Sequence, residues 1–150
     1  MNQHIKSTLT VILPLLLLIP TTMLAQDNNL SFIRDTDDDN LKWGQCPDFM
    51  PKSCSISVLQ GDPAKPNTDL FFKLQGNTSV PNYWHHSAER MVLVSGKMEV
   101  KYKGQDLATI STGGYAYGPP EKPHTAFCIS DDPCVLFIAF NKPVDAFAVE

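Results

Sequence analysis

A tyrosine, a glutamate and three histidines have the residue types and the spacing of a small metal site. The stretch PNYWHHSAERMVLVSG, residues 81–96, holds Tyr83, His85, His86 and Glu89, and His124 follows further along the chain. Successive side chains of an extended chain point to opposite faces, so Tyr83, His85 and Glu89 share one face and His86 the other. Imidazole together with carboxylate suits zinc, iron, nickel or manganese, whereas calcium prefers oxygen ligands alone.

Two other interpretations of these residues remain open. A β-bulge near Ser87 would re-aim the chain and turn His86 inward. Alternatively, each histidine is an ordinary core or surface residue, which is the commoner situation for a single histidine. The shared face of His85 and Glu89 favours a common site for these two residues.

The segments that must position these residues are predicted to be short strands. From Trp43 onward, runs rich in β-branched and aromatic residues alternate with Gly, Pro and Asn turns, and no run keeps a 3.6-residue apolar period. This pattern predicts an all-β sandwich or barrel with little helix. The expected strands are residues 55–60, 69–74, 89–95, 97–102, 107–111, 115–118, 124–129 and 135–140, with 75–81 expected as a turn.

The same residues resemble the two motifs of the cupin superfamily, whose fold is a jelly-roll β-barrel. His85, three residues, Glu89, six residues and Gly96 match the second half of the first motif. Gly113, Pro119 and His124 follow the spacing of the second motif. The resemblance covers roughly residues 55–141 and implies a cupin barrel, but one fold hosts many reactions.

Three positions depart from the cupin motifs. Tyr83 stands where the family has its first metal-binding histidine, Glu121 where it has glycine, and Cys128 where it has asparagine. The resemblance therefore implies His85, Glu89 and His124 as metal ligands, a set of two histidines and one carboxylate that leaves positions open. Tyr83 is expected either to ligate as a phenolate or to donate a hydrogen bond to a metal-bound water or substrate as a catalytic group. A barrel that no longer binds metal is the remaining alternative.

The N-terminus has the layout of a secretory signal peptide. Lys6 precedes an apolar run, Val11–Ile19, and small or polar residues end at Ala25. The run is shorter than the roughly 20 residues of a membrane span. We therefore expect a signal peptide at 1–25, a flexible acidic arm at 26–42 and one barrel domain at 43–150, exported to the periplasm or secreted, with no membrane span after signal removal.

Four cysteines follow the leader, at positions 46, 54, 128 and 134. In an exported chain an even number predicts disulfides, and the local spacings favour Cys46–Cys54 and Cys128–Cys134 among three possible connectivities. The second spacing favours a hairpin with Ser130–Pro133 as its turn. A zinc site is the rival interpretation, although neither pair has the two-residue spacing of a zinc knuckle.

Charge and family resemblance together limit the functions to be considered. The net charge of −4 with scattered Lys and Arg gives no footprint for nucleic acid. The resemblance implies a divalent transition metal (iron, zinc, nickel or manganese), dioxygenase-like oxidation of a small organic molecule, and a homodimer. The alternative is a non-catalytic cupin module that binds or senses a metal or small ligand.

Overall fold

The structure is a computed structural model that describes residues 31–150. By their contacts, residues 33–150 form one unit. Short strands joined by tight turns make up the unit, and no helix occurs among the described residues. The strands are β1 (Gly44–Gln45), β2 (Ser55–Gln60), β3 (Thr68–Leu74), β4 (Thr78–Trp84), β5 (Glu89–Ser95), β6 (Lys97–Tyr102), β7 (Ala108–Ser111), β8 (Tyr115–Gly118), β9 (His124–Cys128), β10 (Cys134–Phe140) and β11 (Phe147–Ala148).

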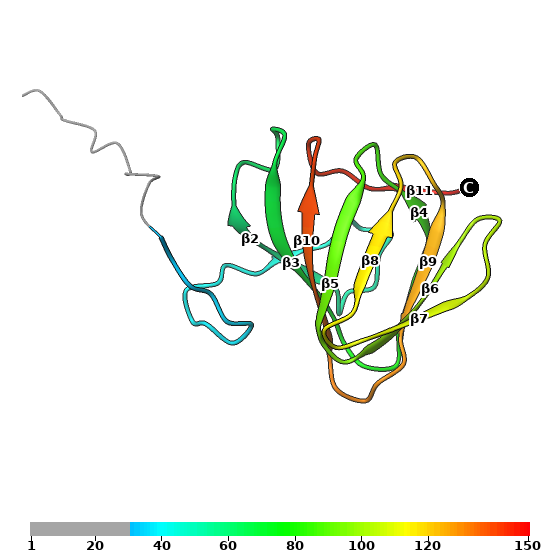
Figure 1. Ribbon diagram of the computed structural model, residues 1–150, viewed down its shortest axis with the longest axis horizontal. Helices are drawn as coiled ribbons and strands as arrows, with labels where there is room; N and C mark the ends of the chain where they lie inside the picture. Colours follow the sequence, from blue (N-terminus) through cyan, green and yellow to red (C-terminus); the bar gives the residue numbers. More distant parts are fainter. Residues whose placement is uncertain (1–30) are drawn as a thin grey trace, which may run out of the picture. The chain divides into compact units, whose positions relative to one another are not determined.

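The strands pair into two antiparallel sheets that enclose one main core (Figure 1). One sheet has the order β1-β2-β3-β10-β5-β8 and the other β11-β4-β9-β6-β7. Each sheet turns one apolar face inward. β5 alternates between buried and more exposed residues, whereas β3 and β10 are buried or half-buried along their whole length. Leu70, Leu74, Val80, Leu93 and Met98 are fully buried at this interface. The predicted all-β jelly-roll barrel is confirmed.

Three strands were not expected from the sequence: the two-residue strands β1 and β11, and the longer strand β4. Residues 75–81 were expected as a turn because they contain Gly76, Asn77 and Pro81, but β4 begins at Thr78 and pairs with β9 and β11. The chain turns earlier, where Asn77 takes a φ of 56°. Gly76 packs so closely on the 130–131 loop that a Cβ would lie 2.0 Å from the carbonyl oxygen of Asp131. Pro81 is tolerated in β4 because it occupies a bulge.

That bulge sets the direction of the site residues. Val80 pairs with Ala126 and Tyr83 with His124, so Pro81 and Asn82 stand opposite Thr125 alone. The extra residue lets both Val80 and Tyr83 face the interior. From Tyr83 onward, alternate side chains point inward as far as Glu89.

Both expected disulfides are present, but one has a different structural setting. Cys46–Cys54 ties the segment before β2, and Cys128–Cys134 joins the end of β9 to the start of β10. The predicted hairpin is wrong, because β9 and β10 belong to different sheets. The second disulfide therefore links the two sheets at one end of the barrel, which explains how Cys128 is both interior-facing and bonded.

The predicted leader and arm are only partly within the described residues. The signal peptide at 1–25 lies outside them, as do residues 26–30 of the arm. Leu41, near the end of the arm, is buried against Phe71 and Val135 on the outer face of the larger sheet. Within residues 31–150, no helical segment meets the length and hydropathy needed to cross a membrane.

Candidate metal site

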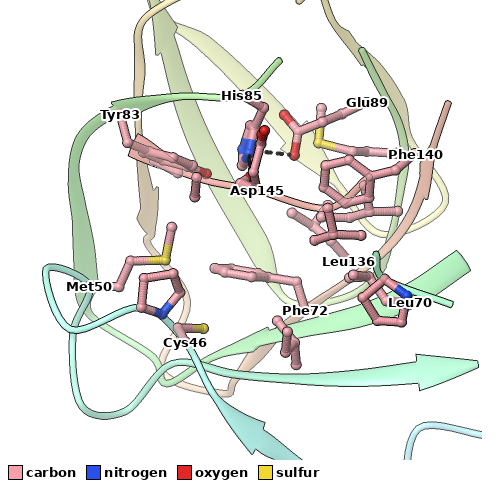
Figure 2. A pocket seen from close by; sticks show the side chains of 18 of the residues that line it. Cys46, Met50, Leu70, Phe72, Tyr83, His85, Glu89, Leu136, Phe140 and Asp145 are labelled. Carbon is pink, nitrogen blue, oxygen red and sulfur yellow. Dashed lines mark hydrogen bonds and ion pairs between the residues drawn. The ribbon is translucent and has the colours of Figure 1, made fainter. Parts of the chain in front are cut away.

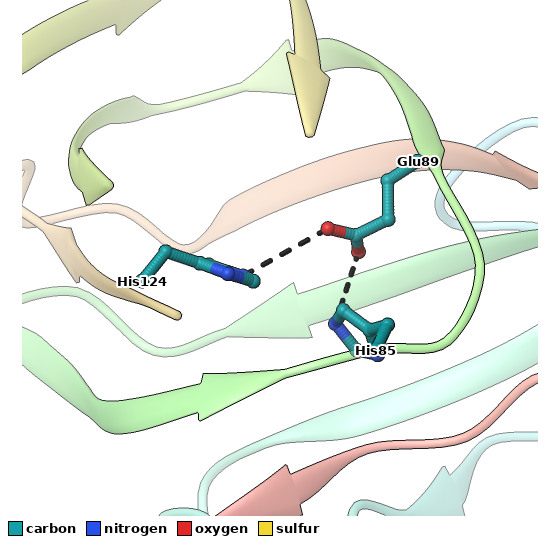
Figure 3. Close-up of side chains that lie close together, drawn as sticks. All are labelled: His85, Glu89 and His124. Carbon is teal, nitrogen blue, oxygen red and sulfur yellow. Dashed lines mark ion pairs between the residues drawn. The ribbon is translucent and has the colours of Figure 1, made fainter. Parts of the chain in front are cut away.

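Three buried side chains from three separate segments converge inside the barrel (Figure 3). His85 follows β4, Glu89 begins β5 and His124 begins β9, and they are 7%, 3% and 5% exposed. Nε2 of His85 lies 3.3 Å from Oε1 of Glu89, and Nε2 of His124 lies 3.8 Å from Oε2. One ligand atom from each residue falls within 4.8 Å of the others. The structure thus brings together the three residues that the cupin resemblance implied as ligands.

Backbone carbonyls set the tautomer of both imidazoles. Nδ1 of His85 donates to the carbonyl of Asp145, and Nδ1 of His124 donates to the carbonyl of Lys122 at 3.0 Å. A carbonyl only accepts, so each neutral ring carries its proton on Nδ1 and leaves a lone pair on Nε2. Nε2 of His85 is buried and makes no aligned hydrogen bond within the described part of the chain. Two nitrogen lone pairs and a carboxylate then face one point, which is the arrangement that a cation fits.

The electrostatics of these groups agree with a site built for a cation. Burial lowers the pKa of His85 and of His124, which keeps both rings neutral near pH 7. Burial raises the pKa of Glu89 to about 7, although nearby His124 opposes the shift. Without a cation, the carboxylate is costly to ionise in this position.

Tyr83 faces the same interior. Its ring centroid lies 5.0 Å from that of His85 and 4.2 Å from that of His124. Burial, followed by the charges of Glu89 and Tyr102, raises the pKa of Tyr83 well above 10. A phenol with that pKa keeps its proton, which favours the hydrogen-bond donor over the phenolate ligand.

His86 points away from the site. Its side chain is 48% exposed, and its Nδ1 donates to Oδ2 of Asp145 at 2.6 Å. Its ring lies edge-on to Trp84 and Phe147 on the outer surface. The alternative in which a bulge near Ser87 turns His86 inward is wrong, because the bulge lies upstream at Pro81 and Asn82.

Two residues at the site were missed by the sequence analysis. Tyr102 lies beside His124 in the β6–β9 pair, and its buried hydroxyl has no hydrogen-bond partner in the described part of the chain. A Cβ at Gly118 would lie 2.6 Å from that hydroxyl and 2.9 Å from Oε2 of Glu89, so both atoms flank Gly118. Asp145 contacts both His85 and His86. Neither residue belongs to a recognisable motif, and only strand pairing brings them here.

The loop before His124 is hydrogen-bonded to the backbone of His85. Glu121, in the position of the motif glycine, adopts a left-handed φ of 58°. Its backbone N–H donates to the carbonyl of His85 at 2.7 Å. A left-handed φ is the conformation that glycine adopts most easily, which explains the glycine of the cupin motif. Glu121 adopts the same conformation and forms the turn without a glycine.

A cavity of about 300 Å³ opens on one side of the candidate site (Figure 2). Tyr83, His85 and Glu89 form its polar end. Its other walls include the segment at Cys46 and the C-terminal segment at 144–146. Most of the remaining lining is apolar and includes Ile56, Leu70, Phe72, Met91, Leu136 and Phe140.

The comparisons with known proteins identify the same fold. Residues 70–140 match a family model described as a cupin domain. No curated protein matches the chain. A DMSP lyase from Ruegeria pomeroyi is similar in structure at 12% identity and a TM-score of 0.64, covering 73% of this chain and 61% of that one.

Two oxalate decarboxylases are also similar in structure. The Bacillus subtilis enzyme (an S161A mutant) has 16% identity and a TM-score of 0.57, covering 66% of this chain and 29% of that one. The Lactobacillus farciminis enzyme has 16% identity and a TM-score of 0.59, covering 73% and 33%. The chain spans less than two thirds of each neighbour, and likeness at these identities shows the fold alone. Residues 70–140 are thus similar to a cupin domain, and the described strands share the fold of these structures.

Proposed function

We propose that the protein is an exported, metal-dependent enzyme acting on a small organic molecule. His85, Glu89 and His124 would hold one divalent transition metal: iron, zinc, nickel or manganese. The observation that carries the proposal is the orientation of both imidazoles, each fixed through Nδ1 with its Nε2 lone pair facing Glu89. A related fold is described with Mn(II) centres in Bacillus subtilis oxalate decarboxylase.

The surrounding residues support a reaction site beside the metal. The bound ion would act as a Lewis acid or bind dioxygen, which is the chemistry that two histidines and one carboxylate with open positions support. The apolar cavity would hold the substrate against Glu89 and His85 and exclude water. Tyr83, which keeps its proton, would donate a hydrogen bond to the substrate. We propose that the reaction is a dioxygenase-like oxidation, which would make the protein an oxidoreductase.

A non-catalytic module that binds or senses a metal or small ligand is the second candidate. It rests on the same three protein ligands and the same cavity, which can hold an ion or a small ligand without turnover. In their metal-based versions the two candidates differ only in turnover.

Metal content tests what the two candidates share. The protein would be purified without a metal-affinity tag and its bound metal measured, then titrated with Fe²⁺, Mn²⁺, Ni²⁺ and Zn²⁺. Close to one ion per chain is expected, with loss in His85→Ala and in His124→Ala. The matched control is His86→Ala, which removes the neighbouring histidine and should retain the ion. Absence of binding to all four ions would contradict the metal-based versions of both candidates.

Turnover separates the two candidates. Oxygen consumption by the iron-loaded protein would be followed with a panel of small phenols, thiols and diketones. Consumption that requires Glu89 and falls in Tyr83→Phe supports the enzyme. Tight binding of a panel member without consumption or product supports the module.

Export and assembly are proposals with their own tests. The two disulfides fit an oxidising compartment. Mass spectrometry of the protein from its native host should show a chain that begins at Gln26 and contains no free thiol. Light scattering should show a homodimer, and a monomer across micromolar concentrations would contradict that expectation.

A further inference from the structure

We infer that the cavity binds a mainly apolar molecule that presents a single metal-binding group at one end and carries no other charged group. The inference rests on the proposed metal function and adds the chemical class of the ligand. Three features of the cavity lead to it: the distribution of polar groups, the signs of the charges and the size.

The buried polar side chains of the cavity are gathered at one end, whereas Gln45, the polar lining residue beside Cys46, is exposed. Figure 2 shows Tyr83, His85 and Glu89 together at this end, while Phe72, Leu70 and Met50 line the part that leads away from it. Leu136, Ile138 and Phe140 add a further apolar wall from β10. A ligand with donors at both ends would bury one of them against hydrocarbon without a hydrogen-bond partner.

The charges of the lining are of one sign. Glu89 and Asp145 are its only ionisable carboxyl groups, and no Lys or Arg lines it among the described residues. A divalent ion held by the Glu89 carboxylate and two neutral imidazoles would carry one net positive charge within its ligand set, which a single phenolate, enolate or thiolate would neutralise. The carboxylate of Asp145 is outside this set, because it accepts hydrogen bonds from His86. A carboxylate at the far end of the ligand would be buried without a cation, which is strongly unfavourable.

The size of the cavity sets the scale of the ligand. An apolar cavity of about 150 Å³ accepts benzene. The cavity here, of about 300 Å³, therefore suits one substituted ring or a compact aliphatic molecule of similar bulk. The rings of Phe72 and Phe140 offer faces and edges against which such a ligand can pack.

Two probes of similar shape test the effect of a charge at the end of the ligand opposite its metal-binding group. 4-Isopropylcatechol and 3,4-dihydroxybenzoate share the same metal-binding diol and differ in an isopropyl against a carboxylate group. Their affinities would be measured by calorimetry on zinc-loaded protein without oxygen. At least tenfold tighter binding of 4-isopropylcatechol is expected. Equal affinities, or a preference for 3,4-dihydroxybenzoate, would overturn the inference.

A pair of variants tests whether the cavity lining causes the preference for 4-isopropylcatechol. Ile56 is half-buried in β2 and lines the cavity, whereas Val58 lies two residues further on the same strand, is exposed and does not line it. Ile56→Arg should reduce the preference for 4-isopropylcatechol at least tenfold, while Val58→Arg should leave it unchanged. An equal effect of both variants, or no effect of Ile56→Arg, would show that the binding lies elsewhere.

The metal content of each sample separates this inference from the proposed function. Protein that holds no zinc would contradict the proposed metal site. In that case isopropylbenzene and benzoate replace the two diols in a thermal-shift assay, and stabilisation by isopropylbenzene alone supports the apolar class. Zinc-loaded protein that prefers the carboxylate would overturn the ligand class and leave the metal site standing.

Discussion

The backbone carbonyl of Asp145 accepts the hydrogen bond from Nδ1 of His85 that fixes the direction of this ring. The carboxylate of Asp145 in turn accepts from the backbone N–H of His86 at 3.0 Å and from its Nδ1 at 2.6 Å. The C-terminal segment is thereby attached to both histidines, and one of its residues orients a candidate metal ligand.

Loss of this attachment should weaken metal binding. Asp145→Ala removes both hydrogen bonds that hold residue 145 against His86, so its carbonyl no longer has a defined position beside His85. We expect about a tenfold loss of Zn²⁺ affinity by calorimetry, the lower end of the usual effect for such partners. His86→Ala keeps the backbone hydrogen bond and should lose less. Unchanged affinity in Asp145→Ala would contradict an orienting role.

Removal of the buried carboxylate should stabilise the metal-free protein at alkaline pH. The pKa of Glu89 is raised from 4.5 to about 7, so the unfolded chain loses this proton first and stability falls as pH rises through that window. Glu89→Gln removes this loss and can donate to Nε2 of His85. Above pH 7 we expect its free energy of unfolding to be higher by on the order of 3 kcal/mol.

Urea denaturation at pH 8 and at pH 4.5 checks this expectation. The difference between Glu89→Gln and the native chain should be largest at pH 8 and small at pH 4.5. A less stable Glu89→Gln protein at pH 8 would show that Glu89 has a structural role.

Metal affinity should depend on pH because the ion must replace the proton of Glu89. Below the pKa of about 7, binding releases that proton, so the affinity should fall about tenfold per pH unit. Above pH 8 it should be nearly constant, since both histidines are already neutral. Calorimetry in buffers of different ionisation enthalpy counts the released protons directly. The same affinity at pH 6 and pH 8 would rule out Glu89 as the titrating ligand.

Tyr102 should contribute to metal affinity and not to the stability of the metal-free protein. Its hydroxyl has no partner in the described part of the chain and flanks Gly118 together with Oε2 of Glu89. Tyr102→Phe removes an unsatisfied buried group, so the metal-free protein should be equally stable or more stable by up to about 1 kcal/mol. When Glu89 is ionised by a bound metal, the hydroxyl can donate to it, so Zn²⁺ affinity should fall several-fold. A large loss of thermal stability would contradict this assignment.

Glycine at position 121, the residue that the cupin motif has there, should make the protein more stable. Glu121 has a φ of 58°, which costs a non-glycine residue about 1–2 kcal/mol. The greater freedom of glycine in the unfolded chain offsets part of this gain. Glu121→Gly should therefore raise the free energy of unfolding by up to about 1 kcal/mol. Glu121→Ala keeps the strain and serves as the control, for which no gain is expected.

Local patterns determined much of the barrel. Runs rich in β-branched and aromatic residues between turn residues predicted the bounds of β3, β5 and β10 to within a residue. The two-residue period of an extended chain placed Tyr83, His85 and Glu89 on one face and His86 on the other. The cysteine spacing predicted both disulfides.

Tertiary structure decided what depends on contacts between distant residues. β4 was missed because Pro81 and Asn82 are turn residues by composition, and only pairing with β9 shows that they form a bulge. The pairing of β9 with β6 placed Tyr102 next to His124, and the return of β11 to β4 placed Asp145 on His85 and His86. These pairings depend on how whole strands align with one another. The spacing of residues along the chain does not predict that alignment.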